Sequence, residues 1–150
     1  MDLTIRLEQG VLNCRVAAVI IKEGYLLLHK NIQDDYWALP GGRIKLHENS
    51  ADAIVRELKE ELNIQLQCKR LLWVSENFFN IKEDHYHEFG FYYEIDSQNL
   101  QLFPKAFNAY DNEDFVYQWI KIDELNSLHI YPEFIKEKIN DMEFEHYIGN

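Results

Sequence analysis

Alternation between apolar and polar positions predicts strands in the first part of the chain. Apolar side chains occupy every second position of residues 3–7, which is typical of a strand with one buried face. Residues 16–21 are apolar throughout, as in a strand that is covered on both faces. The dipeptide Glu23-Gly24 then predicts a tight turn into the apolar residues 25–28, and hence a β-hairpin.

After a rigid corner the pattern changes to a helical period. A short strand predicted at residues 37–39 runs into the Pro-Gly-Gly sequence of residues 40–42. The apolar side chains of residues 50–62 then recur at the spacing of one helix face. Asn49 or Ser50 is suited to cap the first turn of this helix, because a side-chain oxygen there accepts from free backbone N–H groups.

The second half of the chain again predicts strands, with one long irregular segment. Parts of residues 65–79 and 85–95 alternate between apolar and polar side chains, and a further strand is expected at residues 115–122. Residues 96–114 show no period, and loops of that length often face a substrate. A proline suited to the first helical position predicts a closing helix over residues 132–140.

These elements define the fold class and the domain organisation. Strands on both sides of a central helix, with another helix near the end, predict an α/β (α+β) fold built as a mixed sandwich. The sequence contains no internal repeat, low-complexity tract or linker. We therefore expect a single domain over residues 1–150.

Composition and charge exclude several classes of function. The fractions of hydrophobic (47%) and charged (27%) residues are those of a globular protein rather than a disordered one. No apolar run approaches the roughly 20 residues of a membrane span. The net charge of −11 argues against a general nucleic-acid or anionic-membrane binder. The sequence does not indicate a signal peptide. It does not indicate a disulfide framework either, since its only cysteines are Cys14 and Cys68. A cytoplasmic location is therefore expected.

Three glutamates lie close together on the predicted central helix. Glu57, Glu60 and Glu61 fall within an arc of roughly 100° around the helix axis. One interpretation is a solvated helix face, in which Arg56 pairs with Glu60 and Lys59 adds positive charge. The other is a divalent-cation site, because Mg²⁺ prefers hard oxygen ligands and leaves positions open for water and phosphate. The glutamates by themselves favour the first interpretation.

Residues upstream of the helix favour the second interpretation. Gly41 and Gly42 allow the backbone to bend so that a carbonyl can join a cation shell. Glu48, just before the helix, is placed to pair with Arg56 and to hold the loop against the helix. Loop and helix together then form one oxygen-rich site.

The spacing of these residues resembles the Nudix box. Gly42, Glu48 and the segment 56–64 match the pattern G-x5-E-x7-R-E-U-x-E-E-x-G-U, where U is apolar. The one departure is Asn63, which stands in place of the last glycine and is able to end a helix in the same left-handed conformation. The box covers a small part of the chain, but this many fixed spacings make it a specific signal for the Nudix hydrolase family.

The resemblance implies a fold, a reaction and a set of site residues. The implied fold is a Nudix-type α/β/α sandwich with a mixed central β-sheet. The implied reaction is attack of water on phosphorus in the pyrophosphate linkage of a nucleoside diphosphate joined to another moiety, with Mg²⁺ or Mn²⁺ as cofactor. The implied metal ligands are Gly41, through its carbonyl, and Glu57, Glu60 and Glu61; Arg56 joins the glutamates as a catalytic residue, and Gly42 and Glu48 support the site.

The general base is left open between three acidic groups. In the family it is a glutamate of the box or one from a later loop. Glu113, which precedes Trp119 by six residues, is similar in position to an additional metal-binding glutamate of some members. Glu88 competes with it from the strand of residues 85–95, and Glu113 is slightly preferred.

Other residues with possible ligand chemistry receive structural interpretations. Phe78, Phe79 and Tyr86 have the aromatic rings needed to stack on a base, but aromatic residues at strand ends are more often core or rim. Lys30 and Arg15 carry the charge needed to contact phosphate, but we assign them to a solvated strand edge. These assignments are expectations for the structure to test.

The sequence thus predicts a Mg²⁺-dependent Nudix pyrophosphohydrolase acting on a small nucleotide-type diphosphate. The alternative is a non-catalytic Nudix-like module that binds a nucleotide and regulates a partner. Nucleoside triphosphates, nucleotide sugars, ADP-ribose, dinucleoside polyphosphates and the capped 5′ end of RNA all carry the same diphosphate group. The sequence selects none of them, and it leaves the oligomeric state open.

Overall fold

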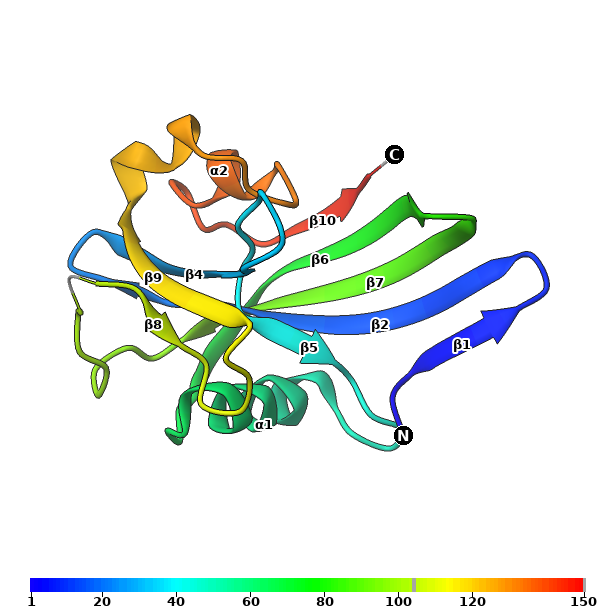
Figure 1. Ribbon diagram of the computed structural model, residues 1–150, viewed down its shortest axis with the longest axis horizontal. Coiled ribbons are helices and arrows are strands. Elements are labelled where there is room, and N and C mark those ends of the chain that lie inside the picture. Colours follow the sequence, from blue (N-terminus) through cyan, green and yellow to red (C-terminus); the bar gives the residue numbers. More distant parts are fainter. Residues whose placement is uncertain (104, 150) are drawn as a thin grey trace.

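The computed structural model describes residues 1–103 and 105–149, and it contains two β-sheets with helices on either side (Figure 1). The strands are β1 (Thr4–Leu7), β2 (Gly10–Val19), β3 (Ile21–Lys22), β4 (Tyr25–Asn31), β5 (Gly41–Arg43), β6 (Cys68–Ile81), β7 (Asp84–Ile95), β8 (Phe107–Asn108), β9 (Phe115–Lys121) and β10 (Glu145–Ile148). The helices are α1 (Ser50–Leu62), the 3-10 helix η1 (Ile122–Ser127) and α2 (Ile135–Lys138).

The larger sheet is mixed and centres on β2, β7 and β6. Its order is β1-β2-β7-β6-β10, with β5 added to β2 beyond the end of β1. Strands β2 and β7 run parallel, as do β6 and β10. Strands β1 and β5 are both antiparallel to β2, and β6 is antiparallel to β7. The smaller sheet, in the order β3-β4-β9-β8, is antiparallel. The long β1–β2 and β6–β7 hairpins extend beyond the helices (Figure 1).

Alternate side chains of β2 enter two different hydrophobic clusters. Val16 and Ala18 pack with Ile54 and Leu58 of α1, because successive side chains of a strand point to opposite faces. Ala17 and Val19 point the other way and pack with a second cluster. That cluster includes Phe134, Ile135 and Ile139 around α2. Helices therefore cover both faces of the sheet, which confirms the predicted α/β/α sandwich.

Helix α1 begins and ends where its sequence predicts. The side chain of Asn49 accepts a hydrogen bond from the Asp52 backbone N–H at 2.8 Å, which caps the first turn. Asn63 ends the helix with φ of 55°, the left-handed conformation expected of the residue that replaces glycine. The helix is held to the sheet by the buried side chains of Ala53, Ile54 and Leu58.

The structure corrects the prediction for the segment before α1. Residues 37–39 do not form a strand; Trp37 and Ala38 make only isolated bridges, to Ile130 and His29. Instead the two glycines lie in β5, which pairs with β2. A glycine pair has low strand propensity, so the pairing with β2 decides the conformation here.

The closing segment also differs from the prediction. The expected helix over residues 132–140 is shortened to Ile135–Lys138, and the 3-10 helix precedes it. The chain then adds β10, which pairs in parallel with β6. All four side chains of β10 are exposed, so the apolar alternation that signals a strand is weak there.

Two further observations concern the whole of the described chain. No helix within residues 1–103 or 105–149 has the length and the apolar composition needed to span a membrane. Cys14 and Cys68 are both free and half-buried. A disulfide therefore contributes nothing to the stability of this fold.

His29 makes the stability of the fold dependent on pH. It is buried between the rings of Phe115 and Tyr117, and its Nδ1 has no hydrogen-bond partner among the described residues. Burial, and secondly the positive charge of Arg15, lowers the pKa of His29 to about 3. The folded protein therefore keeps His29 neutral at pH values where the unfolded chain, with an ordinary pKa of about 6.5, binds a proton.

We expect this difference to reduce stability as the pH falls from about 6.5 towards 3. In His29→Leu, the free energy of unfolding should fall less steeply with decreasing pH, by up to about 1.4 kcal/mol per pH unit. Urea unfolding of both proteins at a series of pH values between 6.5 and 4.5 measures the difference. Parallel stability curves for the two proteins would show that His29 does not titrate in this way.

Candidate active site

The glycines of β5 allow α1 to approach the sheet. Gly41 pairs with Ala17 and Gly42 with Val16. A Cβ atom at Gly42 would overlap the carboxylate of Glu57, and one at Gly41 would overlap the backbone carbonyl of Val16. The absence of side chains therefore lets the Glu57 carboxylate lie directly against the backbone of β5.

Arg56 connects the loop to the helix through five hydrogen bonds. Its Nε and Nη2 donate to the two carboxylate oxygens of Glu48 at 2.6 and 2.9 Å, in the two-pronged geometry that favours arginine over lysine. Nη2 also donates to the Arg43 carbonyl at 3.0 Å, and Nη1 donates to Glu57 at 3.0 Å and to Glu60 at 3.4 Å. One guanidinium therefore holds the loop, β5 and the acidic helix face in fixed relation.

The two partners of this ion pair have strongly shifted pKa values. The hydrogen bonds from Arg56 lower the pKa of Glu48 to about 2, despite a smaller opposing effect of burial. The same bonds raise the pKa of Arg56. Glu48 is therefore ionised throughout the physiological range and serves to position Arg56, as the sequence predicts for a supporting residue.

Glu57 and Glu61 lie in a less hydrated environment than an ordinary surface helix provides. Burial raises the pKa of Glu57, and the hydrogen bond from Arg56 opposes this rise. Burial raises the pKa of Glu61 to about 8, while the hydroxyl of Tyr117, which donates a hydrogen bond to Glu61 Oε2, opposes it. Glu60 differs from both, since its side chain is 46% exposed. The solvated-face interpretation therefore applies to Glu60 but not to its two neighbours.

The chemistry of these groups fits a divalent cation. In the part of the chain that the structure describes, no three His, Cys, Asp or Glu side chains gather into a compact metal cluster. Arg56 and Tyr117 hold the carboxylates of Glu57 and Glu61 instead. Even so, Glu61 is a largely buried acid whose hydrogen-bond donor is a neutral hydroxyl, and a hard cation would compensate its charge. The assignment of the metal ligands stays a prediction.

The loop before β9 brings a different acid to the site than the sequence suggests. Glu113 is exposed, and its contact is a backbone one, from Asn108 Nδ2 to its carbonyl at 2.9 Å. By contrast, the Tyr110 backbone N–H donates to the Glu61 carbonyl at 2.6 Å, and the charge of Asp111 contributes to the raised pKa of Glu61. The loop therefore reaches α1 through residues 110 and 111, and a role for Glu113 stays a prediction.

Glu88 lies on the other face of the large sheet. It is 8% exposed, and its carboxylate accepts hydrogen bonds from Asn13 at 2.7 Å and from Asn77 at 3.5 Å. Tyr93, which lies five residues further along β7 and therefore on the opposite face, bonds Ser50 of α1 at 2.6 Å. Glu88 therefore lies away from the acidic face of α1.

A cavity of about 220 Å³ lies on the face of the large sheet that carries Glu88. Arg15 and Arg43, which pair across β2 and β5, line it together with Glu88. The positive charge of Arg15 acts to lower the pKa of both Glu57 and Glu61, against the larger effect of their burial. Arg15 is thus a half-buried cation that lines the cavity and acts through its charge on the acids of α1, rather than part of a solvated strand edge.

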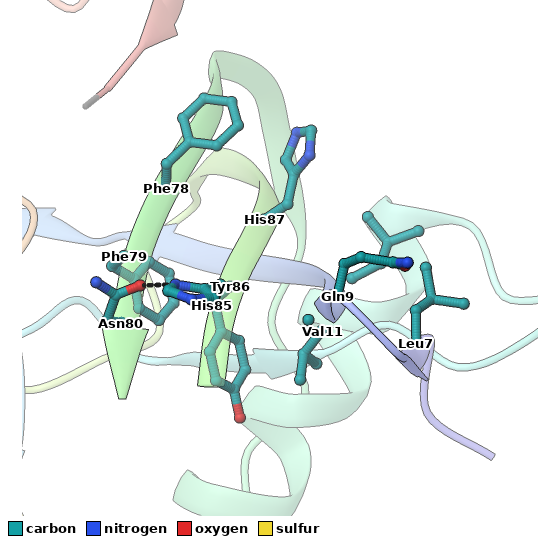
Figure 2. Close-up of a pocket in the computed structure, with 11 residues that line it drawn as sticks. Leu7, Gln9, Val11, Phe78, Phe79, Asn80, His85, Tyr86 and His87 are labelled. Atoms are coloured by element: carbon teal, nitrogen blue, oxygen red, sulfur yellow. Dashed lines mark hydrogen bonds between the residues drawn. The ribbon is translucent and has the colours of Figure 1, made fainter. Parts of the chain in front are cut away.

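A larger cavity, of about 600 Å³, lies elsewhere in the fold. It sits at the tips of the β1–β2 and β6–β7 hairpins, where Leu7, Phe78 and His87 line it (Figure 2). Asn80 and His85 bond each other at its rim at 2.7 Å. Carboxylates do not line this cavity, so its size alone does not make it the site of phosphate chemistry.

A comparison with protein families identifies the family of the chain. Residues 12–140 match the model of the NUDIX domain, which is most of the chain. The chain belongs to the NUDIX family. The predicted recognition is therefore confirmed, and the departure at Asn63 does not separate the chain from the family.

Curated NUDIX relatives resemble the chain at two different extents. The 8-oxo-dGTP diphosphatase of Buchnera aphidicola subsp. Schizaphis graminum is 25% identical over 132 residues, which cover 85% of this chain and 91% of that protein. The RNA pyrophosphohydrolase of Hydrogenovibrio crunogenus is 35% identical over 54 residues, covering 36% of this chain and 33% of that protein. The second similarity is thus confined to one segment.

A solved structure shows the same NUDIX fold. The MutT protein from Methanosarcina mazei Go1 superposes with a TM-score of 0.60 at 18% sequence identity, covering 91% of this chain and 96% of that one. The likeness supports the arrangement of sheets and helices at low sequence identity. It therefore confirms the predicted fold class.

The overlap of a Cβ atom at Gly42 with Glu57 gives a first test of this NUDIX site. In Gly42→Ala, the Glu57 carboxylate must move away from β5, so we expect kcat/KM to fall at least about tenfold. The melting temperature should fall by only a few degrees, because β5 is short and lies at the edge of β2. Steady-state kinetics and thermal unfolding measure both. Unchanged turnover in the folded variant would contradict the role of this close approach.

The structure adds residues that the sequence pattern does not reveal. Tyr117 contacts Glu61 from β9, Arg15 approaches it from β2, and Asn13 and Asn77 hold Glu88. None belongs to the box; Asn13 and Arg15 come from β2, Asn77 from β6 and Tyr117 from β9. The polar residues at alternate positions of otherwise apolar strands are the one signal that points to them.

Proposed function

We propose that residues 1–150 form one catalytic domain that hydrolyses the pyrophosphate linkage of a nucleotide-type diphosphate in a reaction dependent on Mg²⁺ or Mn²⁺. The enzyme is a pyrophosphohydrolase of the NUDIX family, as relatives named 8-oxo-dGTP diphosphatase and RNA pyrophosphohydrolase indicate. The cation dependence and the substrate are the parts that we infer from the site.

One observation carries the proposal: two half-buried carboxylates of α1 have raised pKa values, and a half-buried arginine that lines a cavity acts on both through its charge. Glu57 and Glu61 both have raised pKa values because of burial, and the charge of Arg15 reaches both. A purely structural helix face would be solvated or paired with cations; Glu57 does pair with Arg56, but Glu61 is largely buried and its hydrogen-bond donor is the neutral hydroxyl of Tyr117. Such an arrangement is expected where a ligand supplies the missing positive charge.

The residues of the chain have separable tasks in this reaction. Glu57, Glu60 and Glu61, with the Gly41 carbonyl, would hold the cation, which when bound neutralises diphosphate charge and lowers the pKa of water. Arg56 orients Glu57 and Glu60 through its hydrogen bonds.

Positive side chains extend the site beyond the acidic helix. Arg15 and Arg43 lie on adjacent strands at the cavity, where they can bind phosphate oxygens. A diphosphate between these arginines and the acidic helix would be held from both sides. This placement fits an anionic substrate despite the net charge of −11.

We assign the proton-accepting role to a glutamate of the box rather than to Glu113 or Glu88. The side chain of Glu113 is exposed in the loop, and Glu88 lies across the sheet from α1. We therefore expect Glu113→Gln to retain kcat/KM within about threefold, because an exposed loop carboxylate contributes little electrostatic stabilisation. A loss of kcat/KM above about a hundredfold, which is the range expected for a general base, would show that Glu113 takes part in catalysis.

Phosphate release from a panel of nucleotides, with and without a chelator, tests the proposed function. Cation-dependent release from at least one nucleoside triphosphate, nucleotide sugar, ADP-ribose or capped RNA supports it. Tight nucleotide binding without turnover at saturating Mg²⁺ would support the alternative, a regulatory module. The half-buried acids of α1 favour catalysis, since nucleotide binding alone does not require them.

We also propose that the protein is located in the cytoplasm. Two free cysteines and the absence of a disulfide in the described residues support a reducing cytoplasm.

A further inference from the structure

A row of three polar side chains crosses the large sheet on the face away from α1. The strand register places Asn13 of β2 opposite Glu88 of β7, and Glu88 opposite Asn77 of β6. Their exposed fractions are 4%, 8% and 5%, so the whole row is buried. Buried polar groups are retained where hydrogen bonds satisfy them, and this row forms the floor of the cavity of about 220 Å³.

Hydrogen bonds fix the orientation of both amides. Thr4 Oγ1 donates to Asn13 Oδ1 at 2.8 Å, which directs Asn13 Nδ2 to Glu88 Oε2 at 2.7 Å. On the other side, Asn77 Nδ2 donates to Ser75 Oγ at 3.0 Å and to Glu88 Oε1 at 3.5 Å. Both amides therefore present donors to the carboxylate, so the group left to accept from a ligand is Glu88.

Glu88 retains acceptor capacity towards the cavity. An ionised carboxylate accepts about four hydrogen bonds, and its two amide partners supply two. Both of those partners are neutral. A buried carboxylate with neutral partners is stabilised most by further N–H or O–H donors. The floor of the cavity thus selects a ligand that carries donors rather than acceptors.

Aromatic side chains form a large part of the remaining walls, together with aliphatic ones. The rings of Phe79 and Tyr86 stack at 5.1 Å with an interplanar angle of 7°, next to the polar row. Tyr131 meets Phe79 edge-on at 6.3 Å, and Tyr36 lies 6.2 Å from Tyr131. Gly90, which follows Glu88 on the same face, has no side chain, and those of Ser75 and Tyr92 fill the position that its Cβ would take. These walls favour a planar ring over a flexible or globular group.

The size of the cavity limits what enters it. About 220 Å³ is less than the roughly 300–1,000 Å³ of pockets that enclose a drug-sized ligand. It suits one ring system, with the rest of the ligand outside. Arg15 and Arg43 line the same cavity, so the rest of the ligand would pass two cations and reach the acidic helix.

We propose that this cavity is a nucleobase subsite, in which Glu88 selects a base that presents a ring N–H and an exocyclic amino group side by side. Guanine-type bases have this edge, and two parallel N–H donors match the two oxygens of a carboxylate. Adenine and cytosine carry a ring nitrogen acceptor beside the amino group. This nitrogen would face a carboxylate oxygen, and two acceptors repel each other. Uracil and thymine place one N–H between two carbonyls. The inference rests on the proposed pyrophosphohydrolase function for its kinetic test, but not for its binding test.

The first experiment uses the unaltered protein and two matched substrates. Inosine triphosphate lacks the exocyclic amino group of guanosine triphosphate and is otherwise the same. We expect kcat/KM to be about 10- to 100-fold higher for guanosine triphosphate than for inosine triphosphate. Without the exocyclic amino group, one oxygen of the buried carboxylate is left without a hydrogen-bond donor. Adenosine triphosphate should be still poorer. Equal values for all three would overturn the proposal.

The second experiment replaces the acceptor. Glu88→Gln should lower kcat/KM for guanosine triphosphate by about 10- to 100-fold and should change kcat/KM for inosine triphosphate by less. The ratio of the two kcat/KM values should therefore fall towards one. Glu76→Gln is the matched control, because Glu76 points to the opposite face of β6 and bonds His146 there. A ratio that is unchanged in folded Glu88→Gln contradicts the assignment.

Equilibrium binding separates this inference from the proposed function. Calorimetry with guanosine and inosine monophosphates, in the presence of a chelator, needs no turnover. Preferential binding of the guanosine compound that Glu88→Gln abolishes supports the subsite, even if every nucleotide fails as a substrate. Turnover of nucleotides without any base preference leaves the proposed function standing and overturns the subsite. Discrimination only among nucleotide sugars would assign the cavity to a sugar and would also overturn it.

Discussion

Replacing Glu61 with glutamine should reduce kcat/KM by about 10³-fold, while the protein stays folded. The carboxylate is the most buried of the three on α1, and burial raises its pKa to about 8. A group held in such an environment interacts strongly with any charge that develops near it, and removing one such group typically costs about 10²–10³ in rate. Glutamine keeps the size of the side chain and still accepts the Tyr117 hydrogen bond.

Measurements of activity and folding on the same preparation decide this prediction. Steady-state kinetics at saturating Mg²⁺ gives kcat/KM, and thermal unfolding should show a change of no more than a few degrees. Glu137→Gln, on the exposed face of α2, makes the same chemical change away from the site and should leave both values unaltered. Turnover within about threefold of the unaltered protein would remove Glu61 from the catalytic machinery.

Replacing Arg56 with alanine should give the largest loss of stability, and it should also abolish most activity. The change removes five hydrogen bonds and leaves the half-buried carboxylates of Glu48 and Glu57 without their cation. Breaking a buried ion pair by removing one partner costs about 3–5 kcal/mol. The side chains here are 15–22% exposed, so we expect about 2–4 kcal/mol in urea unfolding.

Two further variants separate charge from geometry at this position. Arg56→Lys keeps the charge but loses the two-pronged bond to Glu48, so it should recover less than half of the lost stability. A double-mutant cycle of Arg56→Ala with Glu48→Ala should give a coupling energy of about 1–3 kcal/mol. Additive effects in that cycle would show that Glu48 and Arg56 do not act as a unit.

The acidic helix shows how far a local pattern reaches. The spacing of Glu57, Glu60 and Glu61 along α1 is a local property, because the helix fixes the angle between successive side chains. The same spacing is compatible with a solvated face, and Glu60 is indeed exposed. What distinguishes Glu61 is burial against Tyr117 and the loop before β9, which comes from distant parts of the chain.

The corner before the helix shows a conflict between local and tertiary preferences. Two adjacent glycines predict a flexible bend, and they instead extend as β5 along β2. The lack of a side chain at Gly42 matters because Glu57 of α1 lies directly against it, and Gly41 lacks one where the backbone of β2 approaches. The same feature that weakens a strand locally therefore permits the close contact between β5 and Glu57.

The sequence by itself determined the family, the bounds of α1 and the layered fold class, because these depend on short-range spacing and on alternation of apolar residues. It also predicted the C-cap at Asn63, whereas the structure chose Asn49 over Ser50 as the N-cap. The sequence also placed Glu48 and Arg56 together, since both lie within the box. Tertiary structure alone decided the environment of each acid. Burial raised the pKa of Glu61, and the pairing of β2, β7 and β6 assembled Asn13, Glu88 and Asn77, because strand register joins residues that are distant in the chain.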